Sequence, residues 1–144
     1  MEQIDKPLFV IDNDPIVPWP VTVKLPAAGG TFADYQFTAL MRVLSPAEYE
    51  KLFADATGAE GNAPKLSEIV KLNAPIFKRL ITGWEGVNDR EGNAVAYSPE
   101  KLAEQVTGPR GPALSAGLWR AISEVRYGRR LDDGTEEDGA ALGN

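Results

Sequence analysis

The chain has 144 residues, a formal net charge of -6, and neither cysteine nor histidine. The missing residue types exclude disulfides, thiol nucleophiles, Ser-His-Asp triads and nearly all zinc sites. A chain of this length suits one domain with a modest core, so we expect a small non-enzymatic protein without a metal or cofactor.

The negative charge is concentrated in the last residues. Segment 132–144 holds no base but carries five acids, Asp132, Asp133, Glu136, Glu137 and Asp138. Without them, 16 acidic and 15 basic residues remain, a net charge of -1. The bases are scattered apart from Arg126–Arg130, so no nucleic-acid partner is expected. Segment 131–144 is rich in glycine and acids and is predicted to be a disordered acidic tail.

Residues 1–18 are predicted to form a proline-rich arm. They mix acids and prolines with a short apolar run, Leu8–Ile11. Because proline lacks an N–H, the segment Asp12–Pro20 can contribute at most an edge strand. Neither a signal peptide nor a membrane span fits the sequence, since nowhere do eighteen apolar residues follow one another. We therefore expect a cytoplasmic protein without a membrane partner.

The next segments alternate apolar and polar residues with the period of a strand. Val21, Val23 and Leu25 alternate with polar neighbours, and segment 35–43 alternates in the same way beyond a PAAGG turn. These patterns predict a β-hairpin from about Trp19 to Leu44.

Two helical patterns follow the hairpin. Ser45, Pro46 and Glu48 have the spacing of a capping box at the start of the first helix. The second pattern runs from Leu66 to Ile81, and we expect a kink or a break near Asn73. The reason is Pro75, which removes a backbone hydrogen bond and disfavours helix at the preceding residue.

Two further helices are predicted after residue 97. Ser98 is expected to cap a short helix that carries Leu102, and the last helix is expected from about Pro112 to Tyr127. The predicted fold is therefore α+β and mainly helical, with an N-terminal β-hairpin followed by four or five short helices. It forms one domain, 19–130, between the arm and the tail.

The segment between the second and third helices raises the question of a metal loop, a catalytic loop or a rigid connector. Its NDREG motif lacks the ligand spacing of a calcium loop. By contrast, Asp89 can open a turn, Gly92 can supply a positive φ, and Val87 and Val95 can pair as a small hairpin. We predict a rigid connector, with Trp84 packing back on its own helix as an anchor.

A weaker alternative to a non-enzymatic protein is an enzyme whose catalytic groups are all carboxylates. An enzyme that used acids alone would have to bring distant carboxylates into one pocket, and the candidates are Asp12, Asp14, Asp89 and Glu91.

Candidate partner-binding side chains lie away from the main apolar stripes. Trp119 and Arg126 are seven residues apart on one flank of the last helix, and these two residue types often anchor interaction hot spots. The structural alternative is a cation–π pair or a second core contact under the hairpin. Leu72 and Ile76 lie opposite the stripe of the second helix. With Tyr127, these four residues form the predicted partner-binding set.

One stretch resembles a known family. Segment Ile81–Val106 is similar to the tail assembly chaperones of long-tailed bacteriophages: a helix ending in tryptophan, a Gly-Val, an Asp, a Gly, a strand with an aromatic residue, a capping Ser and a short leucine-bearing helix. These positions are Trp84, Gly86, Val87, Asp89, Gly92, Val95, Tyr97, Ser98 and Leu102.

The resemblance implies a role in virion assembly in the host cytoplasm. A member of this family would bind the hydrophobic, helical tape-measure protein, keep it soluble and assist assembly of the tail tube. The tail-tube protein is then a second candidate partner, and the chain itself a third, as a homo-oligomer. The alternative function is a minor structural protein of the phage tail or head-tail junction.

Overall fold

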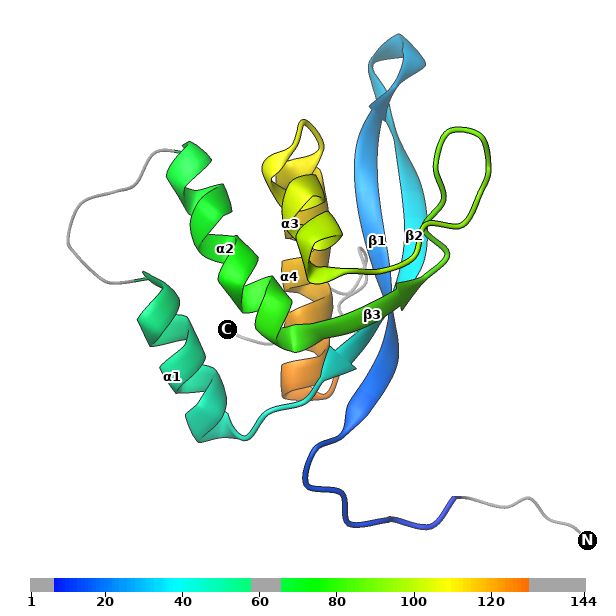
Figure 1. Cartoon of the computed structure of the whole chain (residues 1–144). Coiled ribbons are helices and arrows are strands. Elements are labelled where there is room, and N and C mark those ends of the chain that lie inside the picture. The colour runs from blue at the N-terminus through cyan, green and yellow to red at the C-terminus, as the bar shows by residue number, and fades with distance from the viewer. Residues whose placement is uncertain (1–6, 58–65, 130–144) are drawn as a thin grey trace, which may run out of the picture.

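A computed structural model of the chain describes residues 7–57 and 66–129, without side chains for 55–57 and 66–72. In these residues a three-stranded antiparallel sheet of order β1-β2-β3 packs against helices (Figure 1). The predicted acidic tail, 131–144, lies outside the described residues.

The predicted hairpin is present. β1 (Ile16–Ala27) pairs with β2 (Thr31–Arg42) along their whole length, and the 3-10 turn Ala28–Gly30 joins them. Gly29 adopts a φ of 78° in this turn, a conformation that glycine tolerates without steric cost. β1 begins at Ile16, inside the segment predicted to be an irregular arm.

β1 is an edge strand, and three prolines lie along its open edge. The Val43 N–H donates to the Pro15 carbonyl at 2.9 Å. The alternation of an antiparallel ladder then directs the backbone of odd-numbered β1 residues toward β2. Even-numbered residues, among them Pro18, Pro20 and Pro26, face the open edge. Because proline has no N–H, this edge offers few donors to another strand.

The predicted fold class is wrong in the proportion of helix to strand, because the chain is not mainly helical. A third strand, β3 (Ile81–Glu85), begins directly after a helix and pairs with β2 through Ala39–Trp84 and Leu40–Gly83. The helical spacing of apolar residues predicts that the helix continues as far as Ile81. Ile81 and Thr82 are β-branched and Gly83 is a poor helix former, so this stretch favours a strand once β2 offers its edge.

Three helices of the described chain begin or end at predicted capping residues. In α1 (Pro46–Thr57) the Ser45 hydroxyl accepts from Glu48 N–H at 3.2 Å and Glu48 Oε1 accepts from Ser45 N–H at 3.0 Å, which confirms the capping box. Ser98 caps α3 (Pro99–Thr107) through Lys101 N–H at 3.0 Å. α4 (Gly111–Tyr127) is followed by Gly128, which caps its C-terminal end with a φ of 73°.

α2 (Leu66–Leu80) corrects a second prediction. Of the expected kink or break near Asn73, the break is absent, because α2 is one continuous helix with Pro75 inside it. The Pro75 side chain is exposed, whereas Ile76 and Phe77 beside it are buried. Burial of these neighbours offsets the cost of the missing hydrogen bond.

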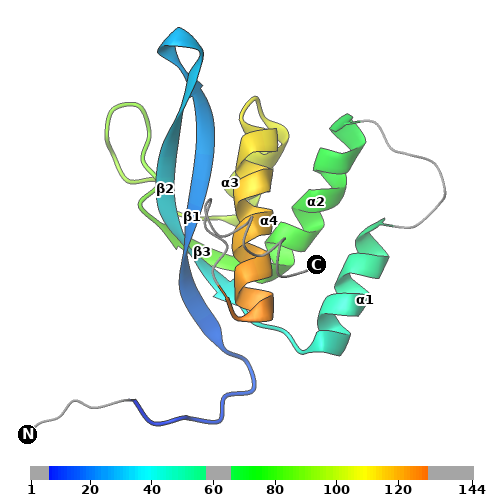
Figure 2. The same ribbon diagram turned by 180° about the vertical axis from the view of Figure 1, so that it is seen from behind.

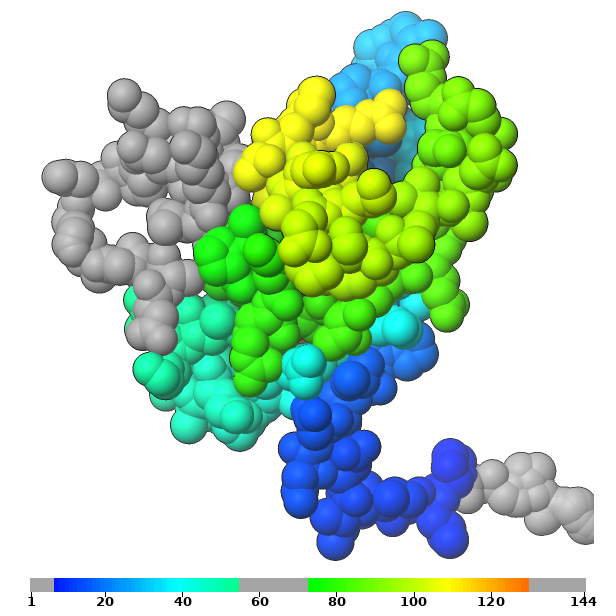
Figure 3. Space-filling model, in the orientation of Figure 1, coloured from blue at the N-terminus to red at the C-terminus, as the bar shows by residue number. Residues whose placement is uncertain are grey.

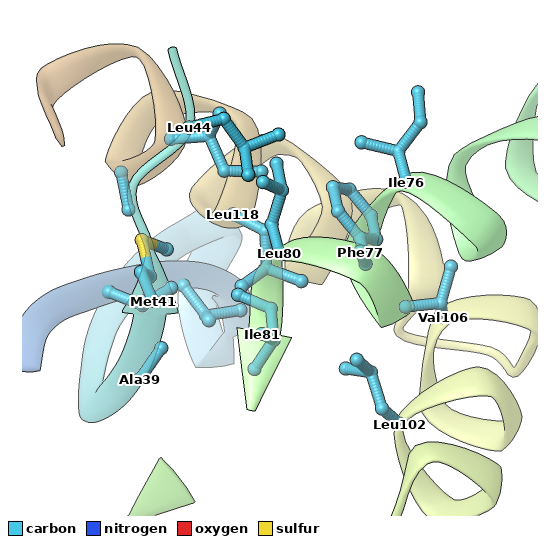
Figure 4. Packing of buried hydrophobic residues seen from close by; sticks show 14 of the residues in the cluster. Ala39, Met41, Leu44, Ile76, Phe77, Leu80, Ile81, Leu102, Val106 and Leu118 are labelled. Atoms are coloured by element: carbon cyan, nitrogen blue, oxygen red, sulfur yellow. The ribbon is translucent and has the colours of Figure 1, made fainter. Parts of the chain in front are cut away.

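The core lies between the inner face of the sheet and the helices. Met41 and Ile81 of the sheet meet Phe77 and Leu80 of α2 and Leu118 of α4 (Figure 4). α4 lies directly on β1, where a Cβ added to Gly117 would stand 2.3 Å from the Thr22 carbonyl oxygen. A glycine is therefore required at position 117.

The helices occupy one side of the sheet only, as the two opposite views show (Figures 1 and 2). α1 lies farther from the sheet and packs on α2. Residues 7–14 (dark blue) project away from the body (Figure 3). We call Pro7–Asp14 the N-terminal arm.

Candidate functional site

A group of aromatic rings and one arginine joins α1, α2 and α4 near the end of α4. We call it the aromatic cluster, and its members are Tyr49, Phe53, Phe77, Trp119, Arg126 and Tyr127.

Trp119 forms the inner part of the cluster. Its ring lies 5.5 Å from that of Phe53 and 5.4 Å from that of Phe77, both inclined by about 60°. The side chain is half-buried. Edge-to-face contacts of this kind stabilise packing beyond burial alone. Trp119 therefore contributes to the structure, and its aromatic contacts are with α1 and α2.

Arg126 forms the outer part. Its guanidinium carbon stands 5.1 Å from the ring centre of Tyr49, 5.0 Å from Phe53 and 4.9 Å from Tyr127. Three rings thus hold one cation, and Phe53 contacts both Arg126 and Trp119. The predicted shared flank of Trp119 and Arg126 is confirmed by this common neighbour. Such a cation–π arrangement fixes the guanidinium at the surface.

The other three predicted partner-binding residues, Tyr127, Ile76 and Leu72, do not share one surface. Tyr127 is 64% exposed beside Arg126. Ile76 is buried in the core, at 3% exposure. Leu72 lies in α2, and its side chain is outside what the structure describes. The structure therefore places Trp119, Arg126 and Tyr127 together and leaves Ile76 inside; a partner-binding role for the set stays a prediction.

Trp84 does not pack back on its own helix as predicted. It lies in β3, where its ring meets Phe37 at 6.3 Å and Tyr97 at 5.1 Å, and its Nε1 donates to the Val95 carbonyl at 2.7 Å. The Tyr97 hydroxyl donates to the Ile81 carbonyl at 2.9 Å. Trp84 is a packing anchor, but it joins the sheet to the returning connector.

The connector itself has the predicted geometry. Val95 N–H donates to the Val87 carbonyl at 2.8 Å, and Gly92 has a φ of 88°. Asp89 Oδ1 accepts from the N–H groups of Glu91 and Asn93, each at 2.9 Å. Gly86 also has a positive φ, 85°, and follows β3. These bonds confirm the turn and the small hairpin predicted for the connector.

Three of the four carboxylates considered for catalysis, those of Asp12, Asp14 and Asp89, have structural partners. Asp12 Oδ1 accepts from Asp14 N–H at 3.0 Å, and the Asp14 carboxylate pairs with Arg42 at 3.2 Å. Asp89 stabilises the connector turn, as described above. Among the side chains that the structure describes, no three acidic groups gather as a metal site would require.

Two groups have shifted pKa values. The Ser45 backbone N–H, followed by the Ser45 hydroxyl, lowers the pKa of Glu48 by hydrogen bonding to its carboxylate. Burial, followed by the nearby Glu100, raises the pKa of Tyr97 above 10.0. Both shifts belong to groups that hold the fold, at the α1 cap and at the contact between Tyr97 and β3.

One further feature of the surface is an exposed apolar run in the N-terminal arm. Leu8, Phe9, Val10 and Ile11 are 88%, 92%, 73% and 81% exposed. In the sequence these residues form an uninterrupted apolar run between Pro7 and Asp12, a signal of exposure that the prediction of an irregular arm does not use.

No family model, no curated protein and no solved structure matches the chain. In the described residues, no helix combines the length and the apolar character needed to cross a bilayer.

Proposed function

We propose that this protein is a phage tail assembly chaperone that binds the tape-measure protein, keeps it soluble and assists tail-tube assembly in the host cytoplasm. The proposal that the chain binds a client depends on the outer part of the aromatic cluster. There Arg126 contacts three aromatic rings, one of which belongs to the exposed Tyr127. The resemblance of Ile81–Val106 to the chaperone family supplies the identity of the client.

The Arg126–Tyr127 pair has the physical character of a binding anchor. Arginine and tyrosine are enriched among residues that dominate binding energy. A guanidinium already held by Tyr49, Phe53 and Tyr127 loses little conformational freedom on binding, which favours affinity. A helical client can place its apolar face on Tyr127 and an acidic side chain beside Arg126.

Trp119 supports this anchor from beneath. Because it packs between Phe53 and Phe77, we expect Trp119→Ala to lower the free energy of unfolding by about 3 kcal/mol. A loss of binding in that variant could come from a lost contact with the client or from collapse of the aromatic cluster. A substitution of the exposed Tyr127 is therefore the more specific test.

The experiment is a binding titration of purified tape-measure segments against the full chain and its variants. Tyr127→Ala and Arg126→Glu should each weaken binding at least tenfold, about 1.4 kcal/mol. Tyr35→Ala is the matched control, because Tyr35 is 57% exposed near the hairpin turn. It should bind like the parent chain. Equal binding by all variants, with melting temperatures unchanged, would refute the assignment of the site.

The alternative function, a minor structural protein of the phage tail or head-tail junction, makes a different prediction. A chaperone leaves the particle after assembly, whereas a structural protein remains. Mass spectrometry of purified particles should therefore find no stoichiometric amount of this chain, and its presence in every particle would favour the alternative.

A further inference from the structure

The N-terminal arm carries four apolar side chains that the described body leaves uncovered. Leu8, Phe9, Val10 and Ile11 are all at least 73% exposed. No hydrogen bond among the described residues involves this run. A contiguous exposed apolar segment of this kind marks an interaction site.

The base of the arm is fixed to the sheet. The Asp14 carboxylate meets Arg42 at 3.2 Å, and Asp14 N–H donates to Asp12 Oδ1 at 3.0 Å. Val43 N–H donates to the Pro15 carbonyl at 2.9 Å. These contacts direct the arm away from its own body (Figure 3).

A complementary surface lies on the sheet face away from the helices. The register pairs Pro18 with Leu40, Pro20 with Thr38 and Thr22 with Gln36, and Gln36 Nε2 donates to Thr22 Oγ1 at 3.4 Å on this face. We call these residues the uncharged face. All six are exposed or half-exposed, and none belongs to the core or packs against it.

Charged pairs bound this face at both ends. Lys24 and Asp34 form an ion pair at 3.0 Å toward the hairpin turn, and Arg42 pairs with Asp14 at the base of the arm. The six residues between these pairs carry no charge, and neither does the run Leu8–Ile11. The arm and the face thus both lack charge, and neither is packed against the hydrophobic core of the described chain.

We propose that two copies of the chain exchange their N-terminal arms, each arm lying on the uncharged face of the other copy. In an extended arm Leu8 and Val10 point to one side, and Phe9 and Ile11 to the other. Full burial therefore requires a surface on both sides. Two bodies related by a twofold axis provide both surfaces, whereas an arm folded back on its own sheet would bury one side only.

The area agrees with a dimer. Four large side chains at about 100 Å² of apolar area each give about 400 Å² per arm. Two arms and the two faces that they cover then bury about 1,600 Å², the size of a standard specific interface. The prolines along the open edge of β1 block the competing route, in which a second copy adds a strand to that edge.

Sedimentation velocity over a range of concentrations tests the exchange. The full chain should form a dimer, and Phe9→Asp and Thr38→Arg should each weaken it at least tenfold. Phe32→Asp is the matched control, since Phe32 is 67% exposed near the hairpin turn, and it should dimerise like the parent. A monomeric parent, or a dimer unaffected by Phe9→Asp, would overturn the proposal.

Engineered cysteines can show which copy's arm lies on the uncharged face, because the natural chain contains no cysteine that would form other disulfides. A double variant, Val10→Cys with Thr38→Cys, should oxidise to a covalent dimer on a non-reducing gel. An oxidised monomer would show that the arm folds back on its own sheet, and no oxidation would show that neither sheet receives the arm. Either result would refute arm exchange.

Discussion

Replacing Trp84 tests the junction between the sheet and the connector. Its half-buried ring contacts Phe37 and Tyr97, and its Nε1 donates to the Val95 carbonyl at 2.7 Å. Truncating a core tryptophan to alanine lowers the free energy of unfolding by about 3–5 kcal/mol. Because this ring is half-buried, we place Trp84→Ala at the lower end, about 3 kcal/mol, including about 1 kcal/mol from the lost hydrogen bond.

A conservative variant separates the ring from the hydrogen bond. Trp84→Phe keeps most of the apolar contact but removes the N–H, so it should lower the free energy of unfolding by about 1 kcal/mol. Tyr35→Ala, an exposed position on the same sheet, should change it by less than about 0.5 kcal/mol.

Urea unfolding followed by circular dichroism measures all three variants. For a domain of this size each kcal/mol lowers the melting temperature by about 2–4 °C. Trp84→Ala should therefore melt about 6–12 °C below the parent. A midpoint equal to that of the parent would show that Trp84 does not join β3 to the connector.

Three further predictions concern single positions. Gly117→Ala should lower the melting temperature by more than 10 °C, because its Cβ would meet the Thr22 carbonyl oxygen at 2.3 Å; an unchanged melting curve would contradict the close packing of α4 on β1. Ser45→Ala should lower the free energy of unfolding by about 1 kcal/mol in urea titrations, as loss of an N-cap does, and no change would argue against the capping box. Burial raises the pKa of Tyr97 in the folded chain. The stability that the neutral Tyr97 side chain contributes is therefore complete below the unfolded pKa of about 10, and it is lost as the pH rises from that value through the folded pKa. Unfolding titrations between pH 8 and 11 should show this loss in the parent and less of it in Tyr97→Phe, and parallel curves would refute it.

Local signals made part of the fold predictable. The caps at Ser45 and Ser98 and the connector turn at Asp89 depend on residues within four positions of one another, and the structure has all three. The hairpin was predictable because its alternation and its turn are contiguous. These features need no knowledge of distant neighbours.

Non-local contacts explain the errors. β3 is a strand because β2, about 40 residues earlier in the chain, offers an edge to Gly83 and Trp84. Helix α2 continues through Pro75 because Phe77 is buried against other elements. The helical phase of Trp119 and Arg126 placed them on one flank correctly, but it could not show that Phe53 of α1 covers that flank.

The most direct test of the proposed function is the soluble amount of tape-measure protein in cells that express it with or without this chain. We predict that the tape-measure protein is mostly insoluble alone, becomes soluble with the parent chain and with Tyr35→Ala, and remains insoluble with Tyr127→Ala. Equal solubility with and without the chain would contradict a chaperone role.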